Sequence, residues 1–229
     1  MTLTVFEDLE QGSPEWMQAR CGIPTASAVG KLLTSTGKVA NNDTARTYTQ
    51  SLIAERITGR VEYTHPSRDM QRGTLLEPYA RDLYAEHYAP VTEVGFMRLD
   101  TDNGWALGYS PDGLIGDDGL LEIKSRNPRI QINTIMWDCV PGANMAQLQA
   151  GLLVSGRDWI DYCSYCPGLP LYVKRVHPDY AWFTAITEAV DAFTESAAEQ
   201  INAYQALTAN LPDTEWFDPF DQEEEIYFG

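Results

Sequence analysis

The chain has 229 residues, of which 44% are apolar, and its formal net charge is −17 at pH 7. This length and composition support one sizeable domain with its own core, and no Pro/Gly/Ser-rich linker divides the sequence. The N-terminus has neither a basic start nor an apolar stretch, and no run of about 18 apolar residues occurs, so we expect neither a secretory signal nor a membrane span. The four scattered cysteines are typical of a cytoplasmic protein with reduced thiols.

The net charge argues against a simple nucleic-acid binder, because contact with phosphate needs Lys and Arg. The distribution of charge weakens that objection. Residues 1–81 hold nine basic and nine acidic residues, whereas the chain beyond Arg175 holds twelve acidic residues and no Lys or Arg. The acidity is therefore concentrated at the C-terminal end, which leaves room for a cleft of positive potential elsewhere.

Helical patterns dominate the first 90 residues. We predict helices at 13–34, broken by a turn at 22–24, from about 43 to 59, and at 74–88. Asp43 or Thr44 is the expected N-cap of the second segment. The third segment contains Pro78, and because proline is tolerated only near a helix start, we expect Glu77 in its first turn.

From residue 91 the pattern changes to strands. They are predicted at 94–99, 105–110 and 120–125, with a tight turn at 117–119 before the third. Downstream we predict a helix at 141–155, strands at 159–165 and 171–176, and a long helix at 179–208. This order is that of an α/β domain with a mixed sheet. We expect residues 1–210 to form this single domain and the acidic segment 211–229 to be a flexible tail.

The types and spacing of Asp112, Glu122 and Lys124 indicate a catalytic metal site. Asp112 lies in a Pro-Asp-Gly turn after one predicted strand, and Glu122 and Lys124 stand two residues apart on the next. Because side chains alternate faces along a strand, Glu122 and Lys124 point the same way, and the turn brings both carboxylates to one edge of the sheet. Two carboxylates with the carbonyl of Ile123 suit Mg²⁺, which takes oxygen ligands and keeps several waters.

A metal site of this kind fits hydrolysis of a phosphodiester. The metal polarises the phosphate and lowers the pKa of a bound water, and a second ion stabilises the leaving oxygen. Lys124 beside that water would orient it and neutralise developing charge. A structural interpretation stands next to this one, since Asp112-Gly113 is common turn chemistry and a Glu-x-Lys on a strand is often a solvated face.

Four segments, in the same order, resemble the phage lambda exonuclease family of alkaline exonucleases (YqaJ-like viral recombinases). They are WMQAR at 16–20 with GIPTAS at 22–27, G-x3-E at 73–77, SPDG at 110–113 with LEIK at 121–124, and MAQLQ at 145–149. Together they span residues 12–150, and the order of predicted elements extends the match to about 208. The resemblance implies a single-domain PD-(D/E)XK, restriction-endonuclease-like core, with a central mixed β-sheet flanked by helices.

The resemblance also implies an activity and a set of site residues. The activity is a 5′→3′ exonuclease on double-stranded DNA, which releases 5′-mononucleotides and leaves 3′ single-stranded tails for recombination. Its cofactor is Mg²⁺, with Mn²⁺ as an alternative and two ions per site. The implied catalytic residues are Asp112, Glu122, Lys124, Glu77 and Gln147; the metal ligands are Asp112, Glu122, Glu77 and the carbonyl of Ile123; and the 5′-phosphate is gripped by Arg20, Ser27 and Ser110.

Several of these roles have a structural alternative. Glu77 with Thr74 matches a capping box, T-x-x-E, at a helix start. The remaining alternatives are a surface ion pair of Arg20 with Glu15, a helix cap at Ser27, and a solvent-facing Gln147.

The family further implies a ring-shaped homotrimer threaded by DNA, a single-strand annealing protein as partner, and action in the cytoplasm of a bacterial host cell. A ring would reconcile the acidic chain with DNA, because its inner wall can be basic. Two other functions stay open: another PD-(D/E)XK nuclease, such as a repair, CRISPR-associated or restriction enzyme, and a non-catalytic DNA-binding protein. Cys163-x2-Cys166 has no second close cysteine pair, so we expect no zinc or iron–sulfur cluster.

Overall fold

The computed structural model of the chain describes residues 1–62, 65 and 67–217. Its helices and strands are β1 (Thr2–Phe6), α1 (Pro14–Arg20), α2 (Ala26–Val29), the 3₁₀ turn η1 (Gly30–Leu32), α3 (Asp43–Thr58), α4 (Arg68–His87), β2 (Phe96–Asp100), β3 (Ala106–Tyr109), β4 (Gly113–Ile115), β5 (Gly119–Ser125), α5 (Pro128–Trp137), α6 (Gly142–Ser155), β6 (Trp159–Tyr165), β7 (Tyr172–Val176) and α7 (Tyr180–Thr208). Among the described residues, no helix has the length and apolar character needed to cross a membrane.

The strands form two sheets that meet at one short connection. One sheet is antiparallel, in the order β1-β2-β3, and the other has the order β4-β5-β6-β7. In the second sheet β5 and β6 run parallel while the other pairs are antiparallel, so the predicted mixed sheet is confirmed. A parallel pair needs a crossover connection, here made by α5 and α6. Residues 110–112 carry the chain from β3 to β4, and therefore from one sheet to the other.

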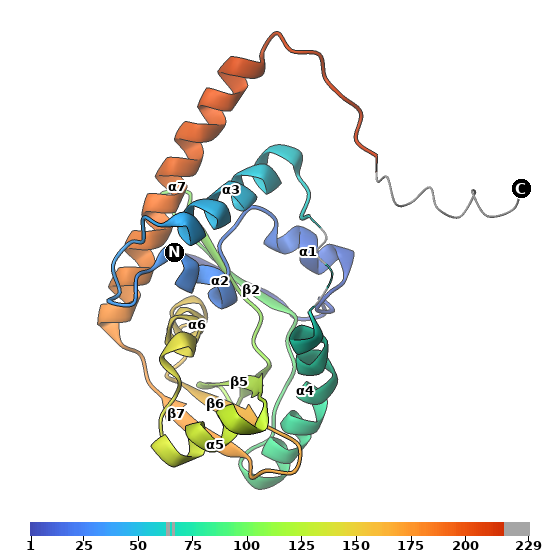
Figure 1. The fold of residues 1–229 in the computed structure, drawn as a ribbon, viewed down its shortest axis with the longest axis vertical. Coiled ribbons are helices and arrows are strands. Elements are labelled where there is room, and N and C mark those ends of the chain that lie inside the picture. Colours follow the sequence, from blue (N-terminus) through green and yellow to red (C-terminus); the bar gives the residue numbers. More distant parts are fainter. Residues whose placement is uncertain (63–64, 66, 218–229) are drawn as a thin grey trace, which may run out of the picture.

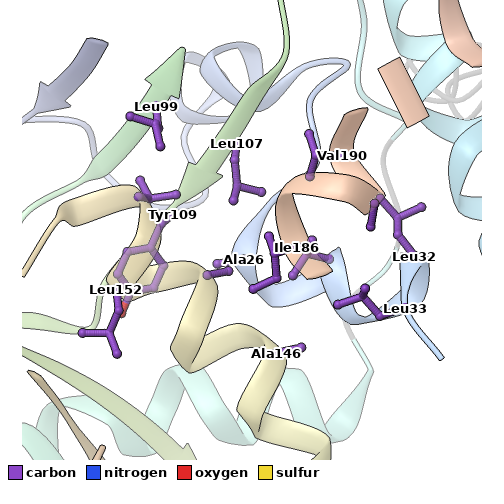
Figure 2. Packing of buried hydrophobic residues seen from close by; sticks show 14 of the residues in the cluster. Ala26, Leu32, Leu33, Leu99, Leu107, Tyr109, Ala146, Leu152, Ile186 and Val190 are labelled. Carbon is purple, nitrogen blue, oxygen red and sulfur yellow. The ribbon is translucent and has the colours of Figure 1, made fainter. Parts of the chain in front are cut away.

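Helix α6 lies at the centre of the main core. Seven of its fourteen residues are buried, including residues on opposite faces, as expected for a helix covered by neighbours on several sides. In Figure 1 α7 runs along one side of the molecule and α4 lies on the other, with α6 between them. Figure 2 shows side chains converging around α6: Ala26 from α2, Leu32 from η1 and Leu33 just after it, Leu107 and Tyr109 from β3, and Ile186 and Val190 from α7.

Helix α4 starts earlier than the sequence predicts. Its N-cap is Ser67, whose hydroxyl accepts a hydrogen bond from the Met70 amide at 3.2 Å, so the helix has 20 residues. Pro78 is consequently inside the helix and Glu77 is near its middle, not in its first turn. The capping-box alternative for Glu77 is also wrong, because the Thr74 hydroxyl donates to the Met70 carbonyl within the helix. Proline inside a helix removes one backbone hydrogen bond, but α4 continues through Pro78 and buries Ala80 and Tyr84 against the second sheet, so packing outweighs that loss.

Other boundaries also differ from the sequence-based expectation. β1, β4 and α5 were not predicted, and the α3 cap is Asn42 in place of Asp43 or Thr44. Residues 2–5 of β1 do alternate polar and apolar side chains, but four of its five residues are exposed, so burial does not follow that alternation. Residues 211–217 contain no helix or strand, and residues 218–229, the larger part of the predicted flexible tail, lie outside the described residues.

Gly151 on α6 gives room to the ring of Tyr109. A Cβ at this position would lie 2.8 Å from Tyr109 Cζ, inside a packed core. We expect Gly151→Ala to lower the free energy of unfolding, because overpacking costs about 1–3 kcal/mol and outweighs the gain of up to roughly 1 kcal/mol from helix propensity. Gly142→Ala on the same helix is the control, since a Cβ there meets nothing within 4 Å. Denaturant unfolding of both variants measures the difference, and equal stabilities would contradict the packing argument.

Candidate active site

Asp112, Glu122 and Lys124 lie together at the edge of the second sheet. The antiparallel register that pairs Gly113 with Leu121 puts Asp112 across from Glu122. Asp112 Oδ2 accepts a hydrogen bond from the Ile123 amide at 2.6 Å, and Lys124 Nζ contacts Glu122 Oε1 at 2.5 Å. The alternation that the sequence shows on this strand therefore does place both charged side chains beside the turn that carries Asp112.

Glu122 is held from three elements. Its side chain is 1% exposed. Besides Lys124, Gln147 of α6 donates through Nε2 to Oε1 at 2.5 Å, and the Tyr109 hydroxyl donates to Oε2 at 3.2 Å. Gln147 thus points at Glu122, and its solvent-facing alternative is wrong. Tyr109 was not predicted as a site residue, because in the sequence it looks like an ordinary core aromatic until the fold brings its hydroxyl to Glu122.

Glu77 approaches the same cleft from α4, where it forms an ion pair with Arg81 one helical turn further on. Arg81 also reaches the Asp112 carbonyl, to which its Nε donates at 2.9 Å, and its third partner is Glu93 at 2.9 Å. Over the part of the chain that the structure describes, no group of three or more Cys, His, Asp or Glu is gathered closely enough to hold a metal. Arg81 was missed by the sequence analysis, although Glu77-x3-Arg81 is a spacing that favours helix ion pairs.

Burial and crowding set the ionisation of these groups. Burial raises the pKa of Asp112 well above its usual range, and the nearby Glu122 carboxylate raises it further. Burial also raises the pKa of Glu77, partly offset by Arg81. For Lys124, burial lowers the pKa, but the carboxylates of Glu122 and Asp112 outweigh that effect, so the pKa is raised and the side chain stays an ammonium.

Two carboxylates with a main-chain carbonyl form a donor set that fits a divalent cation, although no three acidic side chains meet at one point among the described residues. Buried, crowded carboxylates are destabilised when ionised, and a cation with oxygen ligands relieves that cost. Asp112, Glu122 and Ile123 line one cleft, so two carboxylates and a main-chain carbonyl are available at the same edge of the sheet. Glu77 lines this cleft too, on the side of α4.

The predicted phosphate residues gather beside the carboxylates. Trp16 Nε1 donates to Ser110 Oγ at 2.9 Å, and the Arg20 guanidinium stacks on the Trp16 ring at 3.8 Å. Arg20 is thus held by Trp16, not in the surface ion pair considered above. Ser27 contacts the Thr25 hydroxyl at 3.3 Å, and α2 has no side-chain cap, so Ser27 is not a helix cap.

The turn that joins Arg20 to Ser27 is fixed on α3. The Gly22 amide donates to Glu55 Oε2 at 2.7 Å, and Arg56 Nε donates to the Gly22 carbonyl at 2.6 Å. Gly22 has a φ of +70°, and a Cβ there would lie 2.5 Å from Arg56 Cγ. Both the backbone conformation and the close approach of Arg56 therefore require glycine.

One cleft of about 520 Å³ is lined by all the site residues that the sequence predicted. It opens beside a larger groove of about 1280 Å³ with which it shares Arg20, Ser27, Glu77 and Asp112. The nine predicted residues that line the smaller cleft are Arg20, Ser27, Glu77, Ser110, Asp112, Glu122, Ile123, Lys124 and Gln147.

The fold is that of a PD-(D/E)XK nuclease, as comparisons with known proteins show. The chain belongs to the YqaJ-like viral recombinase domain family, whose model matches residues 15–158. It is similar to an alkaline exonuclease (LHK-Exo) from Laribacter hongkongensis, with 35% identity over 87% of this chain and 100% of that chain and a TM-score of 0.76. A structure of LHK-Exo in complex with dAMP matches with the same identity, coverage and TM-score.

A phage related exonuclease from Haemophilus somnus 129PT shares the fold at 12% identity, over 80% of this chain and 96% of that chain, with a TM-score of 0.59. No curated protein sequence matches the chain. The family and the fold class predicted from the sequence are both confirmed.

The raised pKa of Asp112 gives a testable pH dependence. A carboxyl group whose pKa is higher in the folded than in the unfolded state contributes stability at low pH that is lost as the pH rises through the folded-state value. In EDTA, we therefore expect Asp112→Asn to be more stable than the wild type, by a margin that grows as the pH rises from about 4, the ordinary pKa of an aspartate. Denaturant unfolding at several pH values measures this margin.

The matched control is Asp117→Asn, at an exposed turn residue between β4 and β5. Its stability relative to the wild type should not depend on pH in the same range. A margin for Asp112→Asn that shrinks or stays constant with rising pH would show that Asp112 carries no such strain.

Proposed function

We propose that this chain is a divalent-metal-dependent exonuclease that degrades duplex DNA from 5′ ends, releasing 5′-mononucleotides and leaving 3′ single-stranded tails. The observation that carries the proposal is the single cleft lined by carboxylates, Lys124 and Arg20 together. The chain aligns with LHK-Exo over that protein's whole length. The complex of LHK-Exo with dAMP, a deoxynucleoside monophosphate, adds support, because such a molecule is the product class of an exonuclease.

In the proposed mechanism, Asp112, Glu122, the Ile123 carbonyl and Glu77 would hold Mg²⁺ or Mn²⁺, and we propose two ions per site. When bound, the metal polarises the scissile phosphate and lowers the pKa of its water. Lys124, as an ammonium, would orient the attacking water by a hydrogen bond. Its positive charge would also stabilise the negative charge that develops on the phosphate oxygens. Gln147 fixes the Glu122 carboxylate through its bond to Oε1 and presents its amide toward the same cleft.

A pocket for a terminal phosphate would explain preference for a 5′ end. Arg20 presents a guanidinium that can donate two parallel hydrogen bonds to phosphate oxygens. Its stacking on Trp16, which also binds Ser110, fixes the direction of the fork. Ser27 adds a hydroxyl donor to the same cleft. Binding the terminal phosphate next to the carboxylates would place the first phosphodiester at the metal.

The resemblance to lambda-type exonucleases supports two further parts of the proposal. We propose a ring-shaped homotrimer around duplex DNA and a single-strand annealing protein as partner in recombination of phage type. The uneven charge supports the ring, since α7 carries acidic residues and no Lys or Arg and lines neither of the two clefts.

The terminal-phosphate assignment can be tested with three DNA substrates. We expect linear duplex with 5′-phosphate ends to be degraded faster than duplex with 5′-hydroxyl ends, and a covalently closed circle to remain intact. Arg20→Ala should remove the difference in degradation rate between the two linear substrates, because in the proposal the Arg20 guanidinium is the cation that binds the terminal phosphate. Equal rates of wild type on both ends would contradict the phosphate pocket, and cutting of the circle would contradict an exonuclease.

Lys124→Ala tests the chemical step. Loss of a group that stabilises transition-state charge lowers kcat by roughly 100-fold or more, and we expect a loss of that size with 5′-phosphorylated duplex and saturating Mg²⁺. Lys174→Ala is the control, because Lys174, on β7, pairs with Asp138 at the end of α5 and lines neither cleft. Nuclease activity of Lys124→Ala near that of the wild type would refute the mechanism.

A further inference from the structure

Arg81 bridges the two walls of the cleft. One wall is α4, which carries Glu77, and the other is the turn between β3 and β4, which carries Asp112. The Arg81 side chain is 15% exposed and binds Glu77 through one terminal nitrogen and the Asp112 carbonyl through Nε, at 2.9 Å. The other terminal nitrogen contacts Glu93 at 2.9 Å.

The hydrogen bond from Arg81 to the Asp112 carbonyl gives Arg81 a contact that an ordinary ion pair within a helix does not have. An Arg and a Glu four residues apart stabilise a helix only weakly, and that role needs only Glu77. The Asp112 carbonyl lies 31 residues away, in a different layer of the fold. Helix α4 and the turn between β3 and β4 both contribute carboxylates to the cleft, and both are therefore bound to the Arg81 guanidinium.

The Asp112 side chain is fixed at its other end as well. Its Oδ2 accepts from the Ile123 amide on β5 at 2.6 Å, while its main-chain carbonyl accepts from Arg81. The residue is thus held between β5 and α4. The guanidinium supplies the hydrogen bond that ties the Asp112 main chain to α4.

We propose that Arg81 is a positioning residue for cation binding: it sets the separation of Glu77 and Asp112 so that both carboxylates serve one cation site. The inference rests on the proposed metal site, but not on the polarity or substrate of the nuclease. A guanidinium is suited to the task because its donors form a rigid planar fork, whereas a lysine ammonium is a single point charge and cannot span both partners in a fixed geometry.

Two substitutions distinguish positioning from simple neutralisation. Arg81→Lys keeps the positive charge and loses the fork, and Arg81→Met loses both. If Arg81 positions the carboxylates, both variants bind cations more weakly, by about tenfold, as is common when a residue that orients metal ligands is lost. If Arg81 acts only as a counter-charge, Arg81→Met binds cations more tightly, because a neighbouring positive charge is gone, and Arg81→Lys is unchanged.

The probe is Mn²⁺ alone, titrated into the metal-free full-length protein without DNA and followed by electron paramagnetic resonance. Glu93→Gln is the matched control, because it removes the exposed third partner of Arg81 and leaves the two bonds into the cleft; we expect its Mn²⁺ affinity within twofold of the wild type. Circular dichroism confirms that each variant is folded at the temperature of the titration, and Arg81→Lys alone decides the matter if Arg81→Met does not fold.

The outcomes separate this inference from the proposed function. Weaker Mn²⁺ binding by both Arg81 variants, with Glu93→Gln unchanged, supports the positioning role. Wild-type affinity in Arg81→Lys, or tighter binding in Arg81→Met, overturns it while leaving the metal site intact. Absence of Mn²⁺ binding by the wild type overturns the metal site and the inference together, whereas loss of the 5′-end preference alone would leave Arg81 in its assigned role.

Discussion

Burial of the Glu122 carboxylate constrains the rest of the cleft. A buried carboxylate needs several donors, since its removal from water costs several kcal/mol or more when it is left unpaired. Its donors come from β5 itself, from β3 and from α6, as Lys124, Tyr109 and Gln147. The two sheets and the central helix must therefore assemble together before this group is satisfied, so the cleft and the main core form as one unit.

The part of the site that could be predicted from sequence is the part whose geometry is local. Asp112 and Glu122 are joined by a short hairpin, and strand alternation alone fixes the side on which Glu122 lies. Gln147 was predicted only through the resemblance, and Gln149, two residues on, behaves differently: it bonds the His177 carbonyl and the Asp179 amide at the start of α7. Nothing in the local sequence separates these two glutamines, because their partners lie about 25 to 30 residues away.

The fold class followed from element order, whereas several elements did not. α5 went unpredicted although Asn127 caps it and Pro128 opens it, a signal that the sequence does carry. Arg81 and Tyr109 could not be found from periodicity, since each is one more cationic or aromatic residue until segments distant in sequence meet. Helix α4 also runs past the limit that Pro78 usually sets, and its buried Ala80 and Tyr84 pack against the second sheet.

The cleft has an excess of negative groups that bears on the order in which ligands bind. Its charged lining consists of four carboxyl groups and two cationic side chains: Asp69, Glu77, Asp112, Glu122, Arg20 and Lys124. Ionised carboxylates that outnumber the cations repel a phosphodiester backbone, and any cation bound there reduces this repulsion. By linkage, DNA in the cleft strengthens cation binding by the same factor as the cation strengthens DNA binding. The affinity of either ligand measured alone is therefore lower than its affinity in the ternary complex.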